Sequence, residues 1–159
     1  MPVFVYPNIL ASFLALSSYM SAAPLNPNYK SDEYEFYLND LKPKIVLVEP
    51  NSTNSVVAVA KKLKIPVCEI KIKKNQPTGF FDLFNKESNF NEPNENDEAL
   101  VLHTSGTTSR PKIVPLTNKN IYSSSLNISK SLSLSEEDHC LNIMPLFHIH
   151  GLIAIIASS

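Results

Sequence analysis

A loop crowded with hydroxyl side chains is the segment of this sequence best suited to chemistry. Between Thr104 and Ser109, five of the six residues carry a hydroxyl group and the sixth is Gly106. Hydroxyls and unhindered backbone N–H groups can surround the oxygens of a triphosphate, and Lys112 adds a compact positive charge. The order of residues is not that of a Walker loop. Composition alone leaves two alternatives equally open: a phosphate-binding loop, or a solvated Ser/Thr loop.

Two histidines and two cysteines raise the question of a metal site. His148 and His150 could face the same way on an extended segment, but a third ligand at a structural-zinc spacing is lacking, so we expect no metal site. Cys68 and Cys140 lie far apart and form no Cys-x-x-Cys pair. We expect both thiols to be reduced and buried in the core.

The elements that must position the hydroxyl-rich loop follow an alternating pattern. Helical patterns begin near Ile9, Ser31 and Ser52, with Ser31 as a candidate N-cap. Short apolar runs lie between them and read as strands, at 3–6, 22–25, 45–48 and 65–70. This alternation predicts right-handed βαβ units, a mostly parallel sheet and an α/β fold class.

The second half of the chain is predicted to place the loop between a strand and a helix. An Asn-rich stretch over 71–97 reads as a surface excursion tethered by its phenylalanines. A strand over 99–103 then leads into the loop, and Thr117 caps a helix that continues to about 131. Ser135 and Asp138 resemble a capping box. A strand over 141–144 and a buried apolar element near the end complete the pattern.

Three motifs in one order give the chain a family resemblance. Thr104-Ser105-Gly106-Thr107-Thr108 followed by Arg110-Pro111-Lys112 resembles the phosphate loop of the acyl-activating, or adenylate-forming, superfamily. The run from Met144 to Gly151 resembles the next motif of that family, and Pro24 to Pro27 an earlier one. His103, Ser109 and the run 145–151 resemble the oxalate-CoA ligase branch of the acyl-CoA synthetases. The resemblance implies that residues 1–159 are part of an AMP-dependent synthetase/ligase N-terminal domain.

The resemblance also implies a reaction and its site residues. A carboxylate would attack the α-phosphate of ATP to give an acyl-adenylate, and the thiol of CoA would then take the acyl group, with Mg²⁺ as the metal cofactor and its ligand outside this sequence. His148 would lie on the acyl-substrate and CoA side. The ATP phosphates would be bound by Thr104, Ser105, Gly106, Thr107, Thr108 and Lys112. Ile113 stands where the family usually has glycine, so the exit of the loop is expected to differ.

Other motifs of the family do not occur in this sequence. The Tyr-Gly-x-Thr-Glu segment, the Thr-Gly-Asp motif and the C-terminal catalytic lysine are missing, so we expect these residues alone not to complete catalysis. The alternative is a truncated, inactive remnant that binds nucleotide weakly or serves as an interaction module. The net charge of -1 gives no reason to expect nucleic acid. No basic residue precedes Lys30, so a signal peptide is not expected, and a cytoplasmic or peroxisomal location is.

Overall fold

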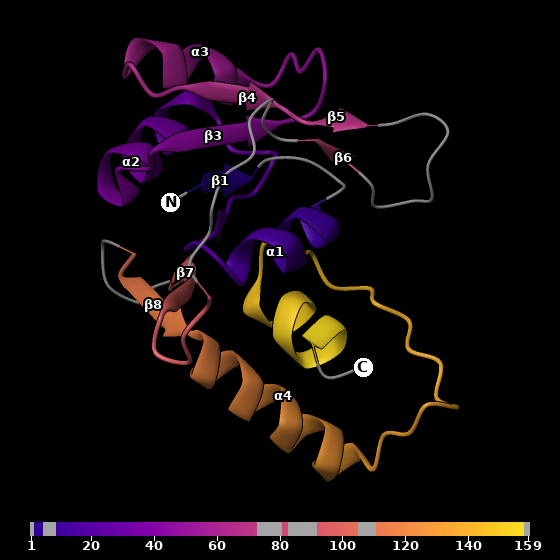
Figure 1. The fold of residues 1–159 in the computed structure, drawn as a ribbon. Helices are drawn as coiled ribbons and strands as arrows, with labels where there is room; N and C mark the ends of the chain where they lie inside the picture. The colour runs from indigo at the N-terminus through magenta and orange to yellow at the C-terminus, as the bar shows by residue number, and fades with distance from the viewer. Residues whose placement is uncertain (1, 5–8, 73–80, 83–91, 105–110, 158–159) are drawn as a thin grey trace.

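A parallel sheet of four strands forms the centre of the N-terminal half (Figure 1). The computed structural model describes residues 2–4, 9–72, 81–82, 92–104 and 111–157. The strands lie in the order β2-β1-β3-β4, and every neighbouring pair is parallel. They are β1 (Pro2–Phe4), β2 (Ala23–Pro24), β3 (Ile45–Val48) and β4 (Val67–Glu69). The predicted α/β class and parallel sheet are therefore confirmed.

Three helices cover the two faces of this sheet. They are α1 (Ile9–Ser17), α2 (Ser31–Leu41) and α3 (Ser55–Lys62). Successive residues of β3 point to opposite faces, so Val46 and Val48 pack with α2 and α3, whereas Leu47 packs with α1. A continuous apolar strand is what a sheet covered on both faces requires.

The N-caps of α2 and α3 are not the residues that the sequence pattern predicted. Ser31 is the first helical residue of α2 rather than its N-cap, which is Lys30. The Lys30 backbone N–H donates instead to Glu33 Oε2, at 2.8 Å. Helix α3 begins later than predicted because Asn54 caps it, its Oδ1 accepting from the Val56 N–H at 2.9 Å. In both cases an acceptor side chain satisfies a backbone donor at the helix start.

An antiparallel hairpin carries the hydroxyl-rich loop between its two strands. It consists of β7 (Glu98–His103) and β8 (Ile113–Thr117), with His103 opposite Ile113. Strand β8 was not predicted, because Pro115 in its middle weakens the strand signal. The hairpin joins the four-stranded sheet through Ala22, which pairs with Leu100.

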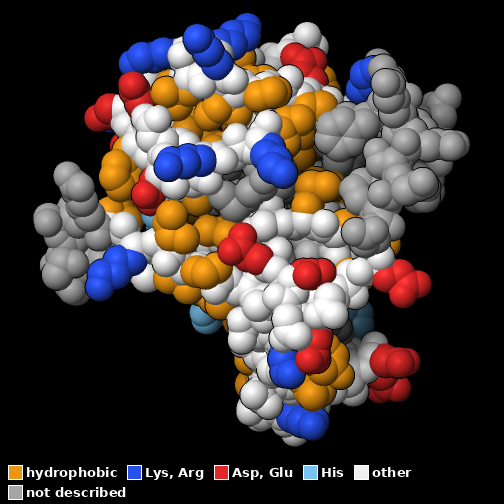
Figure 2. All heavy atoms as spheres, turned by 60° about the vertical axis from the view of Figure 1, so that its left-hand side comes forward, with side chains coloured by type: hydrophobic (Ala, Val, Ile, Leu, Met, Phe, Trp, Pro, Cys, Tyr) orange, Lys and Arg blue, Asp and Glu red, His pale blue; other side chains and the backbone are white. Residues whose placement is uncertain are grey.

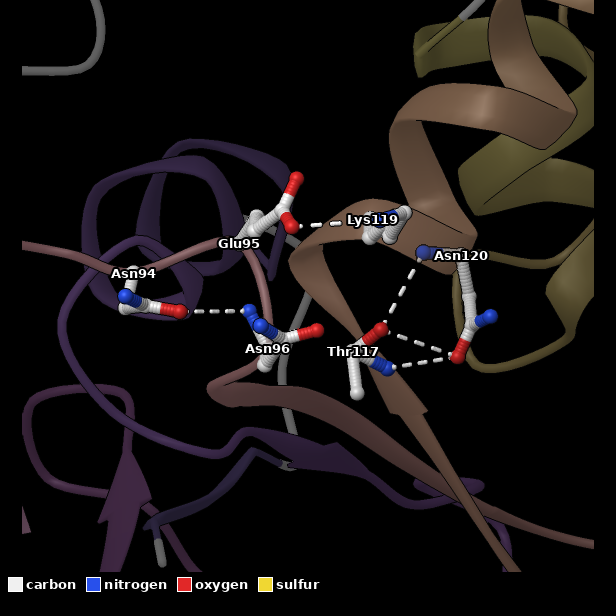
Figure 3. A network of polar contacts seen from close by, with 6 residues as sticks. All are labelled: Asn94, Glu95, Asn96, Thr117, Lys119 and Asn120. Carbon is white, nitrogen blue, oxygen red and sulfur yellow. Dashed lines mark hydrogen bonds and ion pairs between the residues drawn. The ribbon is translucent and has the colours of Figure 1, made fainter.

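Helix α4 (Asn118–Leu132) follows β8 directly and begins where the sequence predicted. Thr117 Oγ1 accepts from the Asn120 N–H at 3.2 Å, while the Thr117 N–H donates to Asn120 Oδ1 at 3.0 Å. This reciprocal cap lies beside the turn that leads into β7, where Lys119 pairs with Glu95 at 3.1 Å (Figure 3). The start of α4 is thereby tied to the start of the hairpin.

The last described element is the π-helix η1 (His150–Ala157), which packs near α1 and α4 (Figure 1). Its Leu152 and Ile153 are buried, as the apolar end of the sequence predicted. The predicted strand over 141–144 is wrong, because Leu141 and Ile143 are more than 80% exposed and form no ladder. Among the described helices, none has both the length and the apolar character to cross a membrane.

Several smaller predictions also need correction. Ser135 and Asp138 do form their contact, at 2.7 Å from N–H to carboxylate, but it closes a turn and not a helix. Cys140 is exposed rather than buried, and Cys68 is only partly buried. Within the 71–97 excursion, the short antiparallel strands β5 (Lys71–Ile72) and β6 (Phe81–Asp82) pair. The expected tether by Phe80 and Phe84 falls on residues outside the described part.

Candidate functional site

A cavity of about 510 Å³ lies where the hairpin, the N-terminal sheet and the segment before η1 meet. It brings together residues from all three motifs that the sequence singled out. Thr104 comes from the base of the loop, His148 from the 144–151 motif, and Asn26 from the Pro24–Pro27 motif. Motifs far apart in sequence therefore line one space, as a binding site requires.

Thr104 and Lys112 form the described base of the loop. The Thr104 N–H donates to the Lys112 carbonyl at 2.9 Å, and the Lys112 N–H donates to Thr104 Oγ1 at 3.1 Å. These two bonds extend the hairpin pairing by one residue on each strand. The Thr104 hydroxyl therefore accepts a backbone hydrogen bond across the base of the loop. Lys112, on the opposite strand, is exposed.

The other phosphate-binding residues predicted from the sequence cannot be placed. Ser105, Gly106, Thr107 and Thr108 lie outside the described residues. The structure therefore fixes the two ends of the predicted loop and leaves its phosphate contacts as a prediction. Ile113 at the loop exit has ordinary strand conformation in β8, so glycine is not required at this position.

His148 is the last residue of the turn that begins at Pro145 and precedes η1. Its N–H donates to the Pro145 carbonyl at 3.1 Å, and its ring lies 4.7 Å from that of Phe147. Gly151 makes this turn possible, because a Cβ there would meet the Pro145 carbonyl oxygen at 2.6 Å. His150 begins the helix and is not among the residues that line the cavity. The two histidines therefore do not share the cavity.

A row of aromatic rings forms the wall of the cavity on the α2 side. Tyr29 and Tyr37 stack with centroids 4.8 Å apart, and the ring of His103 meets Tyr37 edge-on at 4.7 Å. The side chain of His103 is only 7% exposed, so neighbouring side chains cover nearly all of its ring. Phe36 continues this row at the surface, since it is 39% exposed and its ring meets Tyr37 edge-on at 5.1 Å. Tyr29 and Tyr37 are not among the site residues that the sequence predicted, because the spacing of aromatic residues in this segment fits helix packing equally well.

Tyr34 supports this wall from behind. It is fully buried, and its hydroxyl donates to the Asn26 carbonyl at 3.0 Å. Burial raises the pKa of Tyr34 to about 12, because the phenolate would lose its water. The pKa of Tyr29 is also raised, chiefly by burial. The neutral phenol of Tyr34 thus holds the Pro24–Pro27 turn in place beneath the cavity.

This shift predicts a pH dependence of stability. A group whose pKa is 10.0 in its ordinary state and about 12 in the fold contributes stability that is complete below pH 10. That contribution is lost as the pH rises from 10 towards 12, since the unfolded chain releases the proton first. We expect the free energy of unfolding of the natural protein to exceed that of Tyr34→Phe at pH 9 and the difference to narrow by pH 12. Urea unfolding of both proteins across this range measures it, and a constant difference would contradict the assignment.

A magnesium site is not supplied by the residues that line the cavity. They include no carboxylate, and no group of three or more His, Cys, Asp or Glu suited to a metal occurs in the described part of the chain. Since Mg²⁺ prefers oxygen ligands such as carboxylates and phosphates, these residues do not fit a protein-bound metal.

Comparison with known proteins agrees with this arrangement of motifs. The family model described as "AMP-binding enzyme" matches residues 6–159, which is nearly the whole chain. The chain belongs to the AMP-binding enzyme family. The sequence resemblance to adenylate-forming enzymes is thereby confirmed.

Two curated members of the AMP-binding enzyme family illustrate the similarity. The oxalate-CoA ligase of Saccharomyces cerevisiae is 36% identical over 163 residues, covering 86% of this chain and 30% of that protein. The oxalate-CoA ligase of Arabidopsis thaliana is 40% identical over 144 residues, covering 87% and 28%. The chain therefore spans less than a third of the length of these relatives.

Solved structures of the AMP-binding enzyme family show the same fold. ATP-bound MatB from Rhodopseudomonas palustris superposes with a TM-score of 0.75 at 26% identity, covering 99% of this chain and 32% of that one. MenE of Bacillus subtilis superposes with a TM-score of 0.73 at 23% identity, which shows the fold alone. The chain thus shares its fold with these two solved structures.

Proposed function

We propose that the full-length gene product containing this chain activates a carboxylic acid with ATP and transfers the acyl group to CoA. The supporting observation is the cavity that places Thr104, at the base of the predicted phosphate loop, in one space with His148. The family's members named as CoA ligases support the reaction class. In this proposal the chain supplies the ATP-phosphate loop.

The first step forms one bond and breaks another. A carboxylate oxygen of the acid attacks the α-phosphorus of ATP, and the bond to the bridging oxygen of the β-phosphate breaks, which releases pyrophosphate. Negative charge increases on the departing pyrophosphate. Backbone N–H groups and hydroxyls of the loop, with the Lys112 ammonium, would stabilise that charge.

The second step takes place on the His148 side of the cavity. The sulfur of CoA attacks the acyl carbon, the carbon–oxygen bond to AMP breaks, and the thiol proton leaves. His148 is exposed at the cavity edge and anchored by its backbone, so its ring can meet a substrate there. We assign it to the acyl-substrate and CoA side. Because Cys68 and Cys140 lie far apart in the sequence and form no Cys-x-x-Cys pair, we propose a reducing location, the cytoplasm or the peroxisome.

The acid is proposed to be small and to carry two carboxylates, such as oxalate. Relatives are named for oxalate and for malonate. The cavity also offers the exposed imidazole of His148 as a polar group that a second carboxylate could meet.

We expect oxalate or malonate to support pyrophosphate release with a kcat/KM at least about tenfold higher than palmitate does. The assay uses the full-length gene product with ATP, Mg²⁺, CoA and each acid in turn. A higher kcat/KM with palmitate would reject the small-acid assignment and leave the reaction class intact. Pyrophosphate release that no acid stimulates would reject the reaction itself. The control is the same assay without CoA, in which the first step should still occur.

A further inference from the structure

The end of β7 is fastened to helix α2 by a side-chain contact just before the loop begins. His103, the last residue of β7, places Nε2 2.9 Å from Asp40 Oδ2. A carboxylate only accepts hydrogen bonds, so Nε2 carries the proton and donates. The ring is nearly enclosed, whereas the Asp40 side chain is 40% exposed. The contact is therefore charge-assisted and partly shielded from water.

Asp40 occupies a position in α2 where helix stability alone does not favour an aspartate. Asp40 lies in the last turn of α2, where the helix dipole disfavours a negative charge. Aspartate is also a poor residue for a helix interior. Helix stability would thus favour almost any other residue here. The interaction with His103 is the described feature that offsets this cost.

The hairpin needs an anchor at the end that carries the loop. Its backbone link to the parallel sheet runs through Ala22, whose N–H donates to Ala99 at 2.9 Å and whose carbonyl accepts from Val101 at 2.8 Å. Those bonds hold the middle of β7. The loop end lies further along, where α2 is the neighbouring element (Figure 1) and His103 reaches Asp40 and Tyr37.

The anchor is directly connected to the base of the loop. His103 precedes Thr104 in the chain, and Thr104 exchanges two hydrogen bonds with Lys112. Fixing the His103 ring therefore fixes the direction in which both loop ends leave the hairpin. We infer that His103 and Asp40 are positioning residues that hold the two described ends of the predicted phosphate loop, Thr104 and Lys112, in place beside the cavity. This inference rests on the proposed function for its catalytic consequence, but not for its structural one.

The structural consequence can be measured without any substrate. In the full-length gene product, amide hydrogen exchange at Thr104 and Lys112 should be about three- to tenfold faster in Asp40→Ala than in the natural protein. Asp40→Asn keeps an oxygen that accepts from Nε2 and should stay near the natural rate. Glu35→Ala is the matched control, because Glu35 lies on the same helix, is similarly exposed at 38% and pairs with Lys62 instead. It should leave both amides unchanged.

The catalytic consequence separates positioning from general stability. Removing Asp40 from the last turn should leave α2 as stable or more stable, so a loss of rate cannot follow from a weaker helix. We expect Asp40→Ala to lower kcat for pyrophosphate release about three- to tenfold, with little effect on the step from preformed acyl-adenylate to acyl-CoA. His103→Phe, which keeps a ring against Tyr37, should lower kcat for pyrophosphate release by a similar factor. The double variant should be no slower than either single one.

These measurements test the anchor, its coupling to the loop and the proposed function separately. Exchange at Thr104 and Lys112 that is unchanged in Asp40→Ala, or equally faster in Glu35→Ala, overturns the anchor. Additive losses in the double variant, or equal slowing of both steps, overturn its coupling to the loop. If the natural protein releases no pyrophosphate with any acid but the exchange pattern appears as expected, the proposed function fails and the anchor stands.

Discussion

Replacing Lys112 with alanine in the full-length gene product should slow pyrophosphate release by about ten- to more than a hundredfold. The lysine is exposed, and its backbone is held at the base of the loop by Thr104. Its ammonium is therefore a cation attached to a backbone position that the hairpin holds in place. A charge-assisted contact that strengthens as pyrophosphate leaves lowers the activation free energy by about 1.5–3 kcal/mol. Its loss therefore slows the step by the factor given above.

The two half-reactions should respond differently to this change. Pyrophosphate release measures the first one, and thioester formation from preformed acyl-adenylate and CoA measures the second. The triphosphate has already gone in the second half-reaction, so Lys112→Ala should leave it nearly unaffected. Thr107→Ala should lose less of the first half-reaction, because neighbouring hydroxyls can replace a single neutral donor.

A matched control removes a lysine elsewhere. Lys130 lies in the last turn of α4, is exposed and does not line the cavity. Lys130→Ala should change neither half-reaction by more than about twofold. The proposed role of Lys112 is refuted if its removal leaves the first half-reaction intact, or if it slows both halves equally.

Local patterns were sufficient to predict the N-terminal half of the fold. Ile45–Val48 is a continuous apolar run, as a strand covered on both faces requires, and its last three residues are buried. Thr117 was predictable as an N-cap because its cap is made within three residues. Such features depend on neighbours in sequence, which the pattern contains.

The parts that sequence could not predict depend on distant partners. Strand β8 contains Pro115, and it pairs only because β7 lies opposite. Leu141 and Ile143 have strand-like apolar character, but nothing in the described chain pairs with them and they stay exposed. Asp40 has no local reason to matter, since its partner His103 lies 63 residues away.

The candidate site shows the same division. The motif resemblance identified Thr104, Lys112 and His148, and the structure brings Thr104 and His148 to one cavity. The contribution of Tyr29 and Tyr37 could not be separated from core packing, because helical spacing accounts for Tyr37 equally well in either role. Both side chains line the cavity together with His103 of the hairpin, whose ring meets Tyr37. A wall formed by two elements is a tertiary property.

The second large effect is expected at Tyr34, where fold and site depend on one side chain. Tyr34→Ala should lower the free energy of unfolding by about 3–5 kcal/mol, as for other large buried aromatic residues. The ring is fully buried among α2, α3 and the sheet, and it meets Tyr29 edge-on at 5.8 Å. Urea unfolding of the full-length gene product, followed by circular dichroism, measures the loss.

Two variants divide that loss into its causes. Tyr34→Phe keeps the ring and removes the hydroxyl with its bond to the Asn26 carbonyl, so we expect a loss of about 0.5–1.5 kcal/mol at neutral pH. Phe36→Ala, two residues away on α2 but 39% exposed, should cost less than Tyr34→Ala because less apolar surface leaves the core. If Tyr34→Ala proves no more harmful than Phe36→Ala, the ring does not form the support beneath the cavity. If Tyr34→Phe has the full effect of alanine, then the hydroxyl bond to the Asn26 turn, rather than packing, holds this wall in place.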